Sequence, residues 1–199
     1  PTDKVKHAHL TNDAELAREV CSTSKRVDSL ELKIDSDCTN YIALFSPVAI
    51  DLRLLLALIK ICGTLERIAD FADSIARHVI TGDCEQPTDT LKEELQVAAM
   101  FDTVISMLSE SFVALESENT RLTGQILAQD ATTHTIYHNA INILADFNQK
   151  DPSRTVCALP TLLVTRKIAR MGAHFSNLLE QIVSYSAAKT PQHPNNPHH

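Results

Sequence analysis

The sequence contains no tryptophan, only four glycines in 199 residues, and few aromatic residues, which make up 5% of the chain. Sheet proteins rely on glycine-containing turns and on strands rich in β-branched and aromatic residues, and runs of that kind are missing here. Apolar residues nevertheless make up 44% of the chain, enough for a buried core. The composition therefore predicts an all-α protein built from long helices.

Basic charge is also scarce, because 18 Lys and Arg residues face 25 Asp and Glu residues, for a net charge of −7. A nucleic-acid partner is not expected, since the basic surface that phosphate backbones require is lacking. No apolar run approaches the roughly 20 residues that span a bilayer. The five cysteines are scattered without CxxC spacing, which excludes a zinc ribbon and favours a reducing, cytoplasmic setting.

Sequence signatures of enzymes are absent as well. There is no glycine-rich phosphate loop, no GxSxG and no HExxH segment. We therefore expect no catalytic activity.

The segment from Asp51 to Arg77 has the clearest helical pattern, and its apolar stripe turns acidic partway along. Carboxylates spaced i, i+4 and i+7 project from one side of a helix and repel one another when ionised. Arg77 on the same stripe could offset them, as could a metal ion with oxygen or mixed ligands, or the acids could simply face solvent. The stripe consists of Leu52, Leu55, Ile59 and Cys62, followed by Glu66, Asp70 and Asp73.

A second long helix is predicted from Asp13 to Phe45, ahead of a very short connection at Ser46-Pro47. Short connections make neighbouring helices antiparallel. Asp28 and Glu66 lie 18 and 20 residues from Ser46, so the two carboxylates are expected at about the same level. Asp28 is thus a candidate to join the acids, with a solvated helix acid as the simpler interpretation.

Breaks in the pattern divide the chain into parts. We expect a flexible leader over residues 1–12, a first repeat of two long helices over 13–82, a second repeat of three long helices over 88–188, and a disordered tail over 189–199. Paired helices, a tight connection and similar core residues recur at an offset of about one hundred residues. The prediction is two tandem antiparallel helical bundles, the first lacking a full first helix.

Two further patterns are less specific. Arg53, Lys60 and Arg67 form a basic line along the Asp51–Arg77 helix, which suits either an acidic partner surface or a solvated flank. His134 and His138 are i, i+4, a spacing that can hold a transition metal from one helix face if a third ligand lies nearby.

The segment Leu65-Glu-Arg-Ile-Ala-Asp70, with Asp51-Leu-Arg53 and Lys60 before it, resembles the first signature of the PhoU family. The family comprises phosphate-uptake regulators built from two similar three-helix bundles, here expected to be spectrin-repeat-like. Its Glu/Asp pair, matched by Glu66 and Asp70, is associated with iron, zinc or another transition metal ion. The chain departs from the pattern at Phe71, where His is usual, and at Ser74, where Asn is usual.

The second signature is matched by the segment from Arg166 to Asn177, except that Ala169 and Ala173 replace the two acids. The resemblance therefore implies a single metal site, centred on Glu66 and Asp70 and aided by Asp73 and Asp28.

By the same resemblance, the expected role is regulation of phosphate uptake and of phosphate-starvation signalling through metal-dependent protein contacts. The implied partners are the ATPase of a phosphate ABC transporter and a membrane sensor kinase. A homodimer is also expected, because a first bundle without its first helix leaves an apolar seam to cover. Two alternatives remain open: the cytoplasmic PhoU-like domain of a sodium-dependent phosphate symporter, and a helical oligomerisation module without metal.

Overall fold

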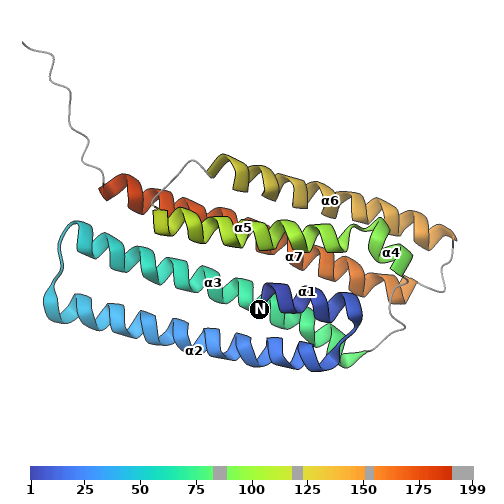
Figure 1. Ribbon diagram of the computed structural model, residues 1–199, viewed down its shortest axis with the longest axis horizontal. Coiled ribbons are helices and arrows are strands. Elements are labelled where there is room, and N and C mark those ends of the chain that lie inside the picture. The colour runs from blue at the N-terminus through green and yellow to red at the C-terminus, as the bar shows by residue number, and fades with distance from the viewer. Residues whose placement is uncertain (83–88, 118–122, 151–154, 190–199) are drawn as a thin grey trace, which may run out of the picture.

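The computed structural model describes residues 1–82, 89–117, 123–150 and 155–189, and these residues form helices and no strand. The all-α prediction is confirmed. Two groups of helices, one from each half of the chain, lie side by side with their long axes roughly parallel (Figure 1). The boundary expected between the two repeats, at 83–87, and the expected tail beyond Lys189 fall outside the described residues.

The first half is dominated by two helices of 32 residues, α2 (Ala14–Phe45) and α3 (Ile50–Thr81). The carboxylate of Asp13 caps α2 by accepting hydrogen bonds from the backbone N–H groups of Glu15 and Leu16, at 2.9 and 3.0 Å. Gly82, with φ of 58°, ends α3 in the left-handed conformation that glycine adopts without strain. The helices run antiparallel and pack together along their length, as predicted (Figure 1).

The structure contradicts the flexible leader expected over residues 1–12. Thr2–Thr11 form helix α1, which contacts α2, α3 and α5. Val5 and Ala8 are fully buried, and their burial holds α1 in place. The three apolar residues of this helix, Val5, Ala8 and Leu10, are too few to show a helical period, so packing rather than local pattern determines it. The first bundle thus has three helices, of which the first is short.

The second half contains α4 (Asp89–Glu94), α5 (Val97–Ser117), α6 (Thr123–Lys150) and α7 (Thr155–Lys189). The single helix expected from residue 88 onward is interrupted at Gln96, where φ is 51°. The described part of this half therefore has one short and three long helices. Pro160 lies inside α7, which continues past it.

The core is centred on α7, which packs against α3, α5 and α6. The apolar stripe of α3 that precedes the acids is only half-buried over Leu52, Leu55, Ile59 and Cys62. The fully buried face of α3 is the neighbouring one, and it includes Ile61, Ile68, Ala72, Ile75 and Val79.

By length and composition alone, helix α5 is long and apolar enough to cross a membrane, although no apolar run of that length was expected from the sequence. In this bundle it packs against α1, α6 and α7, with Met100, Phe101, Val104 and Met107 fully buried. Only 39% of its apolar stretch is buried, so this core position accounts for part of the apolar composition and leaves Phe112 and Val113 exposed.

Candidate metal centre

Three of the four predicted acids come together between α2 and α3. Asp28, Glu66 and Asp70 each offer a carboxylate oxygen, and these oxygens all lie within 4.8 Å of one another. Asp28 and Glu66 are half-buried, whereas Asp70 is exposed. We call this set the carboxylate triad.

The arrangement follows from the helices that carry it. Glu66 and Asp70 are four residues apart on α3, so their side chains lie on one face of that helix. The short connection after Phe45 places α2 antiparallel to α3 and brings Asp28 to the level of the pair. The sequence prediction for these three residues therefore agrees with the geometry.

The negative charges of the triad destabilise one another. Burial, and then the charge of Asp70 and a hydrogen bond with it, raise the pKa of Glu66; Asp28 and Glu31 add smaller contributions of the same sign. The Oδ1 atom of Asp28 is buried without a hydrogen-bond partner among the described residues. An unpartnered buried oxygen beside two further carboxylates fits a cation held by oxygen ligands.

Asp73, the fourth predicted ligand, lies outside the triad. Its Oδ2 atom is 2.6 Å from Nε of Arg77, so the arginine one turn away neutralises it. Burial, followed by the neighbouring Asp73 carboxylate, raises the pKa of the Cys21 thiol to about 11. The alternative considered for the whole acidic stripe, compensation by Arg77, thus holds for Asp73 alone.

The second repeat has a different polar arrangement. Ala169 is buried at the position that matches Glu66. On α6, which packs against this part of α7, Oδ2 of Asp130 accepts a hydrogen bond of 2.9 Å from the Ser176 hydroxyl. Nε2 of His134 lies 3.9 Å from Oδ1 of the same carboxylate. Sequence reasoning paired His134 with His138 and missed Asp130, which lies at the same i, i+4 spacing on the other side.

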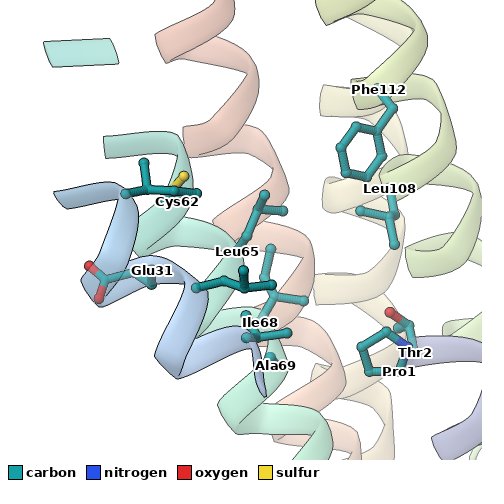
Figure 2. Close-up of a pocket in the computed structure, with 12 residues that line it drawn as sticks. Pro1, Thr2, Glu31, Cys62, Leu65, Ile68, Ala69, Leu108 and Phe112 are labelled. Carbon is teal, nitrogen blue, oxygen red and sulfur yellow. The ribbon is translucent and has the colours of Figure 1, made fainter. Parts of the chain in front are cut away.

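An apolar cavity of about 310 Å³ lies among α2, α3, α5 and the start of α1, and no residue of the triad lines it. Leu65, Ile68 and Ala69 line it from α3, and Leu108 and Phe112 face them from α5 (Figure 2). The carboxylate of Glu31 points away from Leu108 and Phe112, toward the outer side of α2. The side chains that line the cavity are therefore available for apolar packing and do not provide ligands for an ion.

The raised pKa of Glu66 predicts a pH dependence in metal-free protein. The ordinary pKa of a glutamate is 4.5. At a pH just above this value, the folded chain keeps a proton on Glu66 that the unfolded chain has already lost. Unfolding free energy should therefore fall as pH rises through the folded pKa of Glu66, and stay lower above it. In Glu66→Gln protein this decrease should be missing.

Chelator-treated wild-type and Glu66→Gln proteins should be compared by chemical denaturation from pH 4.5 to 7. The difference between the two unfolding free energies isolates Glu66 from other titrating groups, and it should grow with pH in favour of the variant. A difference that does not change with pH would contradict the predicted repulsion.

Comparisons with known proteins agree with the sequence and the fold. The chain matches the family model described as PhoU domain over residues 2–79 and 97–182. A phosphate-specific transport system accessory protein PhoU homolog from a Burkholderia species is 33% identical over 84% of this chain and 72% of its own length. The homolog from Aquifex aeolicus is 31% identical over 84% of this chain and 75% of its own.

Solved structures show the same architecture. The crystal structure of PhoU from Pseudomonas aeruginosa matches with a TM-score of 0.85 and 26% identity, covering 95% of this chain and 89% of that one. The phosphate transport system regulatory protein PhoU from Streptococcus pneumoniae matches with a TM-score of 0.80 at 21% identity, which supports the fold. From the family model, the curated relatives and the shared architecture, this chain belongs to the PhoU domain family.

Proposed function

We propose that the chain is an accessory regulator of phosphate uptake and phosphate-starvation signalling that acts in the cytoplasm through protein contacts. The curated relatives are named as accessory proteins of the phosphate-specific transport system, which supports this role over that of a symporter domain. The carboxylate triad is the observation that carries the metal-dependent part of the proposal.

Asp28, Glu66 and Asp70 would hold a divalent transition metal such as iron or zinc. The ion would supply the positive charge that offsets the triad and would link α2 to α3. The residues themselves set the site up: α3 presents two carboxylates from one face, and α2 contributes the third, half-buried one. Because three carboxylates repel one another without a cation, the surface of this helix pair depends on whether the charge is balanced.

The proposed partners are the ATPase of a phosphate ABC transporter and a membrane sensor kinase, as the family resemblance implies.

A homodimer is also proposed. The turn between α2 and α3 exposes large apolar side chains, with Leu44 76%, Phe45 65% and Val48 75% accessible. Exposed apolar groups of this size at one end of a bundle are typical of an interaction surface.

The proposed function is tested by measuring association with the purified ATPase of a phosphate ABC transporter from the same cell, with and without added iron or zinc. We expect binding that a chelator abolishes and that the Glu66→Gln, Asp70→Asn double variant lacks. The Asp73→Asn variant is the matched control, because Asp73 is on the same helix but outside the triad. Association with the ATPase that is unchanged by the chelator and by the double substitution would contradict metal dependence.

A further inference from the structure

A group of basic residues lies where the two repeats meet, between α3 and α7. These helices pack against each other in opposite directions (Figure 1). The same spacing of 103 residues separates Phe71 from His174 and Arg67 from Arg170. Because the two helices are antiparallel, Arg67 and Arg170 lie on opposite sides of the level at which Phe71 and His174 meet. The rings of Phe71 and His174 are in contact, with centroids 5.6 Å apart.

The two arginines flank this ring pair. Cζ of Arg170 lies 5.2 Å from the centre of the Phe71 ring, so the guanidinium packs over the aromatic face. Arg67 lies four residues before Phe71 on α3, which puts it on the same side of that helix. The charges of Arg67 and Arg170 both reach His174, whose pKa is lowered first by burial and then by these two residues.

A third cation completes the group. Lys167 shares the His174 face of α7, and its Nζ atom lies 3.5 Å from the backbone carbonyl oxygen of Ser74 on α3. Burial lowers the pKa of Lys167. This contact joins the two helices and places a cation three residues before Arg170 on α7.

Neither arginine is neutralised within the part of the chain that the structure describes, where no carboxylate lies within ion-pair distance of Arg67 or Arg170. Both side chains are exposed. Glu66 and Asp70, the acids nearest to Arg67 along α3, both belong to the triad on the flank that faces α2. Two exposed guanidiniums therefore keep their N–H donors available on a protein whose net charge is −7.

We propose that Arg67, Arg170 and His174 form a binding site for inorganic phosphate at the junction of the two repeats. Guanidinium groups present planar pairs of N–H donors that match the oxygens of a phosphate, and the aromatic face of Phe71 holds one of them in place. Because the site is open to solvent, we expect a dissociation constant for phosphate in the millimolar range and weaker binding as ionic strength rises. The site uses residues outside the triad, so it does not depend on a bound metal.

The test is a titration of chelator-treated protein with sodium phosphate at constant ionic strength, followed by calorimetry and by NMR of the His174 imidazole. Wild-type protein should show saturable binding and a saturable shift of the His174 signals. Arg67→Gln and Arg170→Gln should each weaken binding by about tenfold. Arg170→Lys should lie between wild type and Arg170→Gln, because lysine keeps the charge and loses the paired donors.

Arg53→Gln is the matched control, since Arg53 is an exposed basic residue of α3 two heptads before Arg67. It should bind phosphate as tightly as the wild type does. The absence of saturable binding in the wild type would overturn the proposal, and so would an equal loss in all three glutamine variants. If phosphate does not bind, the proposed metal dependence of partner association still stands, because it is tested separately with the variants of the triad.

Discussion

Replacing Asp28 with asparagine should weaken the binding of iron(II) or zinc by on the order of 100-fold. Asp28 contributes the carboxylate whose Oδ1 atom is buried without a partner, and it is the only member of the triad on α2. Its loss leaves two carboxylates on one helix, one of them exposed. Calorimetric titration of the purified variant measures the change directly.

The control for this prediction is Asp73→Asn. That variant also removes a carboxylate from the predicted acidic stripe, but one that is already paired with Arg77 at 2.6 Å. Its metal affinity should equal that of the wild type. If both variants lose affinity equally, general attraction to acidic side chains explains the binding and the triad has no special role.

The second large effect concerns His9, which is 5% exposed on α1. Burial, and then the charges of Lys92 and His78, lower the pKa of His9 from 6.5 to about 4. Between these values the unfolded chain binds a proton that the folded chain does not, so stability falls as pH falls through this window. The loss should reach about 3 kcal/mol by pH 4, at about 1.4 kcal/mol for each pH unit.

His9→Phe should remove this acid sensitivity. The Nε2 atom of His9 has no hydrogen-bond partner among the described residues, and the ring already packs against Phe101 at a centroid distance of 6.2 Å. An apolar ring of similar size therefore loses little there. Denaturation of both proteins from pH 7 to 4 provides the measurement.

His7→Phe, at an exposed position of the same helix, is the comparison for this experiment. It should keep the acid sensitivity of the wild type. If His9→Phe also loses about 3 kcal/mol on acidification, another group is responsible for it.

Local patterns predicted the long helices and all three residues that form the triad. The stretches that became α2 and α3 have a strong helical period and clear end signals, including Gly82. Asp28 could be placed opposite Glu66 because a short connection fixes the level of both. Asp73 was included with the ligands because the stripe alone does not show which acid Arg77 pairs with.

Features that depend on long-range packing could not be predicted in the same way. Helix α1 carries little apolar signal of its own, and its helical state follows from the burial of Val5 and Ala8 against other helices. The break at Gln96 has no glycine or proline to mark it. The meeting of Arg170 with Phe71 requires α3 beside α7, a contact between residues about one hundred positions apart.

The most direct test of the metal centre is anomalous scattering from crystals grown with iron or zinc, recorded at the absorption edge of the metal. We expect one strong peak per chain between the carboxylates of Asp28, Glu66 and Asp70, and no peak near Ala169 and Ala173. A map from fully loaded crystals without a peak at the triad, while its carboxylates face only water, would contradict the metal centre and the metal-dependent regulation built on it.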